Sequence, residues 1–369
     1  MKLSQCIKGR DNNFNLIRFI AAFAVLVSHS FALASGIEAD PFTPRLGMNL
    51  GAMAVDVFFI TSGLLVTGSL LSRKNTLEFV WARVLRIFPG IAVMDFLLVF
   101  GLGLAFTTLP AAAYLKDHQT HAFALKNLTL ITGAEYMLPG VFASVPYKGV
   151  VNGSLWTLPL ELDMYAILAM MWVGLWVLGS LREKLLPYCI VALAGLAFLI
   201  RFYIHFHVHG ERHVESTRMI YMFFTGATFY VLKEHITLSR RVFLVALAAL
   251  LLSAFHREVF YVVYNIVLAY ILFWIAYVPG GFIRAFNRLG DYSYGTYIYA
   301  FPVTQSFLAL MPGVRVPVLI LLSAVVTLTL ASLSWHLIEK RALSLKASPG
   351  KIFRRVTGPN SGRQPVQAQ

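Results

Sequence analysis

An arginine and a histidine lie inside one apolar segment near the start of the chain, RFIAAFAVLVSHS (residues 18–30). Arg18 and His29 are eleven residues apart, which on a helix places them near one face and about 16 Å apart along the axis. A neutral imidazole can take a proton from a hydroxyl group or attack an acyl carbon, so His29 is a candidate catalytic residue. The structural alternative is an arginine that reaches the lipid headgroups and a histidine bonded to a neighbouring helix.

Acidic residues occur at similar depths in two later apolar segments. Asp56 lies in GAMAVDVFFITSG (51–63) and Glu161 in SLWTLPLELDMY (154–165). If these segments cross the membrane, both carboxylates lie within about 10 Å of the outer surface, near the level of His29. A carboxylate bonded to one ring nitrogen makes the other a better base. We therefore predict that Asp56 orients His29 and that Glu161 belongs to the same catalytic group; the alternative for the His–Asp pair is a polar contact that fixes helix packing.

Arginines gather where the next apolar segment begins, in SRKNTLEFVWARVLRIFP (72–89). Arg83 and Arg86 are three residues apart and share a helical face, and Arg73 precedes them. Guanidinium groups suit bidentate hydrogen bonding to phosphate, so these side chains are candidate phosphate ligands. The alternative is ordinary anchoring of the cytoplasmic side by positive charge.

Together these positions suit a donor molecule whose phosphates bind the arginines at one surface and whose reactive end reaches His29. An acyl-CoA has that shape, because a polyphosphate head and a flexible pantetheine arm precede its thioester. An acceptor would approach from the outer side. A secondary transporter or polysaccharide exporter is the main alternative, since charges within the membrane also mark transport paths. A non-catalytic assembly or sensor protein is a second alternative.

The composition indicates that these residues belong to a membrane protein. Of 369 residues, 58% are hydrophobic and only 13% are charged, and the mean hydropathy is +0.70. A soluble domain needs more charge to cover its surface. The net charge of +14 agrees with Lys and Arg in cytoplasmic loops, so no nucleic-acid partner is expected. The two cysteines support neither a disulfide framework nor a metal site, and we expect no metal.

Ten apolar segments predict an all-α, polytopic membrane protein, because about 20 apolar residues cross the hydrocarbon core as a helix. Lys and Arg concentrate in the alternate connections that place both termini in the cytoplasm. The segments lie near 14–35, 50–72, 87–109, 157–179, 187–206, 217–232, 242–256, 259–278, 292–311 and 316–338.

Three parts follow from this pattern. We predict a cytoplasmic N-terminus at 1–13, a membrane domain at 14–340 and a basic, disordered cytoplasmic tail at 341–369. Residues 110–156 form the longest predicted outer loop, which is large enough to shape a substrate entrance. The histidines of the loop 207–216 are expected to belong to an exposed polar loop rather than to a metal site.

At these residues the sequence resembles the acyltransferase type 3 family of integral-membrane O-acyltransferases. The motifs occur in family order over nearly the whole membrane domain, and they are specific as a set rather than singly. They are Arg18 with His29, GAMAVDVFFITSG (51–63), FVWARVLRIFP (79–89), NGSLWTLPLELDMY (152–165), GDYSYGTYIYAFPV (290–303) and SWHLIEK (334–340).

The resemblance implies transfer of an acyl group, usually acetyl, from cytoplasmic acyl-CoA to a surface carbohydrate or a lipid-linked glycan in a bacterial inner membrane. It implies that His29 is the essential catalytic residue and that Arg18, Arg83 and Arg86 bind the donor. Arg73 is a further candidate donor ligand. The candidate acceptor-binding residues are Tyr165, Trp156, Asn152 and Ser62.

Two positions depart from the family pattern. Many relatives have a histidine where this chain has Ala300, so no second catalytic histidine is placed there, and many have a proline where this chain has Arg341. The chain ends some thirty residues after its last apolar segment. We therefore expect the stand-alone type, without the extracellular hydrolase-like domain that some relatives carry.

Overall fold

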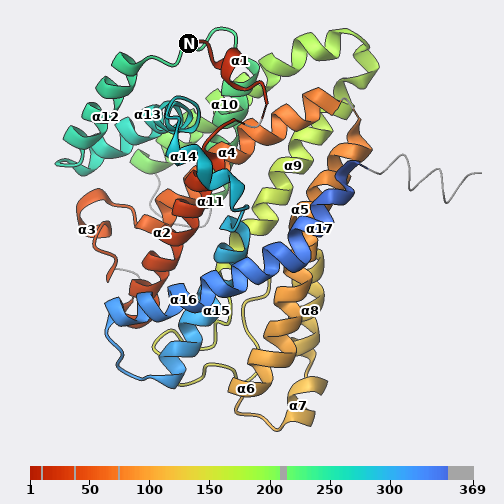
Figure 1. The fold of residues 1–369 in the computed structure, drawn as a ribbon, viewed down its shortest axis with the longest axis vertical. Helices are drawn as coiled ribbons and strands as arrows, with labels where there is room; N and C mark the ends of the chain where they lie inside the picture. The colour runs from red at the N-terminus through yellow and green to blue at the C-terminus, as the bar shows by residue number, and fades with distance from the viewer. Residues whose placement is uncertain (10, 37–38, 74, 208–213, 348–369) are drawn as a thin grey trace, which may run out of the picture.

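The computed structural model describes residues 1–347 except 10, 37–38, 74 and 208–213. These residues form helices joined by turns and irregular segments, and among them β-pairing is limited to isolated bridges such as Lys2 with Thr237. The predicted all-α fold is confirmed. Figure 1 shows α6 (Leu104–Phe106) and α7 (Ala111–Lys116) at the opposite end of the molecule from the N-terminus.

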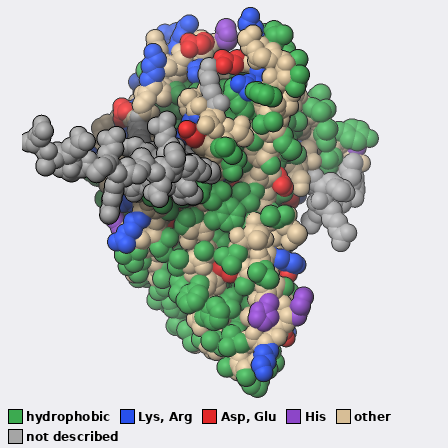
Figure 2. Space-filling view, turned by 90° about the vertical axis from the view of Figure 1, so that its right-hand side faces the viewer, with side chains coloured by type: hydrophobic (Ala, Val, Ile, Leu, Met, Phe, Trp, Pro, Cys, Tyr) green, Lys and Arg blue, Asp and Glu red, His purple; other side chains and the backbone are tan. Residues whose placement is uncertain are grey.

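Among the described residues, seven helical segments are long and apolar enough to cross a membrane, and each overlaps a predicted apolar segment, although the third begins at Thr76 rather than near residue 87. Figure 2 shows apolar side chains over much of the middle of one face, with charged side chains gathered near its upper end. The chain is therefore a multi-pass membrane protein. The segments are Phe14–Ser35, Leu50–Arg73, Thr76–Phe106, Gly153–Leu178, Leu181–His207, Arg257–Tyr277 and Val316–Ser344.

The other three predicted spans are helices too, but they are shorter or carry more polar groups. α12 (Arg240–Ser253) has 14 residues, whereas α11 (Val214–Val231) and α15 (Ser293–Leu310) have 18 each. α12 is joined to α13 (Arg257–Tyr277) by a tight connection, and the two helices pack together. Ten crossings and two cytoplasmic termini stay predictions.

Helix α2 (Phe14–Ser35) carries Arg18 and His29 and is about half buried. It packs against α4 (Leu50–Arg73), α15 and α16 (Val316–Ser334) (Figure 1). α4 in turn packs along α11 with almost no space between backbones, because a Cβ on Gly63 would meet Phe223 O at 1.9 Å and one on Gly226 would meet Ile60 O at 2.0 Å. Small residues permit such close approach. The polar residues of α4 and α11 are thereby held against each other.

The segment predicted as the long outer loop is partly helical. After α5 (Thr76–Phe96) and its π-helical continuation Leu97–Gly103, the chain forms α7 and α8 (His118–Thr129), and α8 packs along α5. Farther along, Leu138, Val141 and Val151 are buried in the core. The loop therefore folds into the bundle, and α9 (Thr157–Gly174), with the 3-10 turn Gly153–Trp156 before it, begins inside the protein.

The end of the described chain is ordered in a way that the sequence did not predict. α16 continues through the π-helical turn Trp335–Glu339 into α17 (Lys340–Ser344) and a 3-10 turn, Leu345–Ala347, and both pack on α5. The indole Nε1 of Trp81 donates to Leu345 O at 3.4 Å. Residues 341–347 are thus helical rather than disordered, while the rest of the predicted tail, 348–369, lies outside the described residues.

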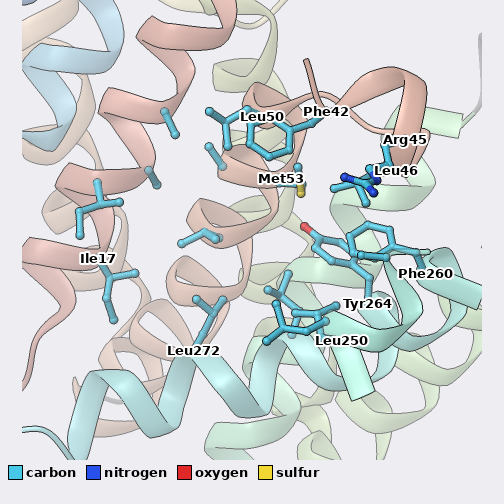
Figure 3. A pocket seen from close by; sticks show the side chains of 18 of the residues that line it. Ile17, Phe42, Arg45, Leu46, Leu50, Met53, Leu250, Phe260, Tyr264 and Leu272 are labelled. Carbon is cyan, nitrogen blue, oxygen red and sulfur yellow. The ribbon is translucent and has the colours of Figure 1, made fainter. Parts of the chain in front are cut away.

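An apolar groove of about 770 Å³ lies on the side of α2 that faces α12 and α13 (Figure 3). Met53, Phe260 and Leu272 line it, and Arg45 lies at one edge with its guanidinium over the ring of Phe255. The ring of Tyr264 also faces the groove, whereas its hydroxyl group bonds to the interior. Tyr264 therefore separates an apolar surface from the polar interior.

Candidate active site

His29 lines a cavity of about 290 Å³ that is formed by α2, α4, α11, α15 and the turn before α9. Its ring packs nearly perpendicular to that of Phe301, at a centroid distance of 5.1 Å. Its Nδ1 atom is buried and has no hydrogen-bond partner among the described residues. The imidazole is therefore held by packing.

Asp56 does not form the predicted pair with His29. Its carboxylate is fully buried and accepts hydrogen bonds from Arg218 Nε at 2.8 Å, Arg218 Nη2 at 3.0 Å and the Tyr264 hydroxyl at 2.9 Å. The close packing of α4 on α11 brings the guanidinium to the carboxylate, and a buried carboxylate is stabilised far better by a cation than by a neutral ring. Equal depth along two helices did not imply contact.

Arg218 was not among the predicted site residues, although it lines the same cavity as His29. It also donates to Ala52 O at 2.6 Å and to Glu215 at 3.3 Å. One signal was available, because an arginine within the apolar segment 217–232 needs an acidic partner inside the protein. Asp56, with no lysine or arginine beside it in its own segment, was the natural choice.

A second, smaller cavity of about 40 Å³ adjoins the first, and Val55 and Tyr297 line both. Arg18, Ser62 and Glu161 line this inner cavity. Because α9 begins inside the bundle, Glu161 lies beside Arg18 rather than in the His29 cavity, which corrects its predicted place.

Three of the predicted residues form one hydrogen-bonded group. Ser62 Oγ lies 3.2 Å from Glu161 Oε1 and 3.1 Å from the Tyr165 hydroxyl, and Tyr165 donates to Glu161. The guanidinium of Arg83 lies over the ring of Tyr165 at 5.7 Å. Tyr165 and Ser62 therefore join the arginines, and they are not among the residues that line the His29 cavity.

Arg86 has two acidic neighbours: it donates to Asp291 at 2.6 Å and lies 4.0 Å from Glu339. Burial alone would raise the pKa of the Asp291 carboxyl, but the charges of Arg86 and Arg18 and hydrogen bonds from Ser293 lower it to about 2. The sequence placed both acids in motifs but assigned them no role.

Two buried guanidinium nitrogens in this region lack a partner among the described residues, Arg18 Nε and Arg83 Nε. Arg73, at the end of α4, pairs with Glu78 at 3.5 Å and is 32% exposed. Unpartnered buried donors favour an anionic ligand, because an unsatisfied charged group is costly. The arginines thus suit phosphate.

Trp156 and Asn152 have different surroundings although they lie four residues apart. Trp156 lines the His29 cavity, as an acceptor-binding residue should. Asn152 is fully buried, and its side chain caps the turn before α9: its amide donates to Ile298 O at 2.9 Å and its oxygen accepts from Ser154 N at 3.2 Å. We therefore withdraw Asn152 as an acceptor ligand.

Among the described residues no group of three or more His, Cys, Asp or Glu could hold a metal ion.

Two curated proteins are similar to the chain over most of its length. The "O-acetyl transferase" of Shigella phage Sf6 is 28% identical over 369 residues, covering 92% of this chain and 98% of that protein. The "Nodulation protein 10" of Rhizobium leguminosarum bv. viciae is 29% identical over 370 residues, covering 92% and 95%. No solved structure matches the chain. The family model described as "Acyltransferase domain" matches residues 11–336, and the chain therefore belongs to the acyltransferase type 3 family.

Proposed function

We propose that this membrane acyltransferase moves an acetyl group from acetyl-CoA to a hydroxyl group of a carbohydrate, and that His29 stands at the point of transfer. The single observation that carries the proposal is the adjacency of two cavities along α2. One holds Arg18 and the other holds His29, and Val55 and Tyr297 belong to both. The main alternative, an exporter, has no comparable support from the chain's family.

The donor is assigned from charge. A CoA thioester carries its phosphates at one end and its reactive carbon at the other, and the buried, unpartnered nitrogens of Arg18 and Arg83 suit the phosphate end. In this proposal the pantetheine arm follows the inner cavity beside Ser62 and Glu161, which at about 40 Å³ has to widen to admit it. The bacterial inner membrane, with CoA on the arginine side, is part of the proposal.

The acceptor is assigned from the lining of the His29 cavity. Trp156 offers an aromatic face for the apolar side of a sugar ring, and Asn49 and Glu215 offer polar groups for its hydroxyls. The name of the phage relative, "O-acetyl transferase", supports acetyl transfer to oxygen. A surface polysaccharide or a lipid-linked glycan is the acceptor class that we propose.

In the proposed reaction the acceptor oxygen bonds to the thioester carbon and the carbon–sulfur bond breaks. His29 takes the proton of the acceptor hydroxyl and returns it to the departing thiolate, so that the products are an ester and a free thiol. A route through an acetylated imidazole would use the same residue in two steps.

The test is His29→Gln, with His235→Gln as a matched control because His235 is exposed. Loss of general-base catalysis should lower the transfer rate at least 100-fold, within the usual range of about 10² to 10⁴. The measurement is mass spectrometry of surface glycans from cells with each variant, together with acetyl transfer from labelled acetyl-CoA by purified protein. Normal acetylation by His29→Gln, or acetylation that needs no acyl-CoA, would overturn the proposal.

A further inference from the structure

A lysine beyond the matched family region lies beside the arginines. The family match ends at residue 336, whereas α17 and the turn Leu345–Ala347 continue across the start of α5. The hydrogen bond from Trp81 to Leu345 O fixes this turn on α5. Lys346, the next residue, is partly buried there.

The charges around Lys346 are mostly of its own sign. Burial, and then the charges of Arg83, Arg86 and Arg73, lower the pKa of the Lys346 ammonium to about 7. Asp291 acts in the opposite direction, but its carboxylate is already bonded to Arg86. The turn that carries Lys346 packs on α5, the helix of Arg83 and Arg86, and a lysine near several arginines is stabilised when an anion joins the group.

We propose that Lys346 binds the 3′-phosphate of the CoA donor. This inference rests on the proposed function, which sends the thioester end of CoA past Arg18 toward His29. The adenosine end, with its 3′-phosphate, must then stay at the solvent-exposed edge of the arginine group, on the side away from His29. Arg73 lies at that edge, since its side chain is 32% exposed whereas that of Arg86 is 11% exposed. Lys346 is partly exposed as well, on the turn that packs on α5.

The phosphate changes the protonation of the lysine. A phosphate monoester is close to a dianion above pH 7 and raises the pKa of an ammonium group that it contacts. In the free protein the Lys346 side chain, with a pKa of about 7, is largely neutral at pH 8.5. CoA binding at that pH therefore requires the uptake of a proton by Lys346. Affinity for CoA should therefore fall as pH rises from 6.5 to 8.5.

The experiment is calorimetric titration of the purified full chain with CoA and with dephospho-CoA at pH 6.5 and pH 8.5. We expect Lys346→Met to weaken CoA binding about tenfold at pH 6.5, as loss of one charge-assisted hydrogen bond does. Dephospho-CoA should bind this variant and the natural protein equally. Lys346→Arg should keep the affinity for CoA at both pH values and abolish the proton uptake at pH 8.5, because a guanidinium stays charged.

Lys340→Met is the matched control, since Lys340 is an exposed lysine on the neighbouring α17, and it should bind CoA normally. The inference is overturned if Lys346→Met binds CoA like the natural protein, or if it loses as much affinity for dephospho-CoA. It is also overturned if Lys346→Arg is as weak as Lys346→Met. Failure of the natural protein itself to bind CoA would instead remove the proposed donor, and this inference with it.

Discussion

Two groups of buried charges along α4 and α5 differ in how completely they are neutralised. In the first, the Asp56 group, both carboxylate oxygens of Asp56 accept hydrogen bonds from Arg218 or Tyr264. In the second, the arginine group of Arg18, Arg83 and Arg86, two guanidinium nitrogens have no partner among the described residues.

The difference distinguishes a structural contact from a candidate binding site. A buried ion pair repays its desolvation only when its hydrogen bonds are complete, and then it has little left to offer a ligand. The Asp56 group meets that condition and ties α4, α11 and α13 together. The arginine group does not, and the polyphosphate of the proposed donor would supply the missing negative charge.

The largest loss of stability should come from Asp56→Ala, in the group whose charges are fully paired. The substitution leaves Arg218 buried without its carboxylate, and breaking a buried pair in this way costs about 3–5 kcal/mol. Thermal unfolding of the purified protein in detergent measures it. Asp163→Ala, which removes an exposed carboxylate from α9, is the control and should unfold like the natural protein. A stable Asp56→Ala variant that has lost acetyl transfer would instead return Asp56 to the catalytic group.

An intermediate effect is expected from Asp291 in the arginine group. Its folded pKa is about 2 and its ordinary value is 3.8, so folding favours the ionised form and the group stabilises the protein above about pH 4. That contribution, about 2 kcal/mol, is lost as pH falls from 4 toward 2. Unfolding measured between pH 2 and pH 5 should show a smaller acid loss for Asp291→Asn than for the natural protein. Equal acid losses would mean that Arg86 does not hold the carboxylate ionised.

The sequence predicted the helices well because apolar length is a local property. All seven long segments, the placement of Arg18 and His29 on α2 and the position of Arg83 and Arg86 on α5 follow from spacing alone. The partners of these residues depend on which helices touch. Asp56 meets Arg218 because glycines let α4 and α11 approach, and depth counting cannot reveal that contact.

Connections were harder to predict than spans. The loop before α9 was expected outside the bundle, yet Val145 and Val151 are buried, so Glu161 lies deeper than its distance along the segment indicated. The basic composition after residue 340 was typical of a disordered tail, but Trp81 and α5 hold its first residues. In both places tertiary packing outweighs local composition.

The smallest effect should come from Tyr264→Phe, which removes one hydrogen bond to Asp56 and keeps the ring in the groove. Because Arg218 still bonds both carboxylate oxygens, the expected loss is about 1 kcal/mol of stability, measured by thermal unfolding, with acetyl transfer unchanged. Tyr188→Phe, at a ring that is 73% exposed, is the control and should unfold normally. A loss of stability as large as that of Asp56→Ala would mean that the Asp56–Arg218 ion pair depends mainly on the hydrogen bond from Tyr264. The Asp56 group would then depend on α13 rather than on the contact of α4 with α11, and its completeness would no longer be a property of the two helices that line the His29 cavity.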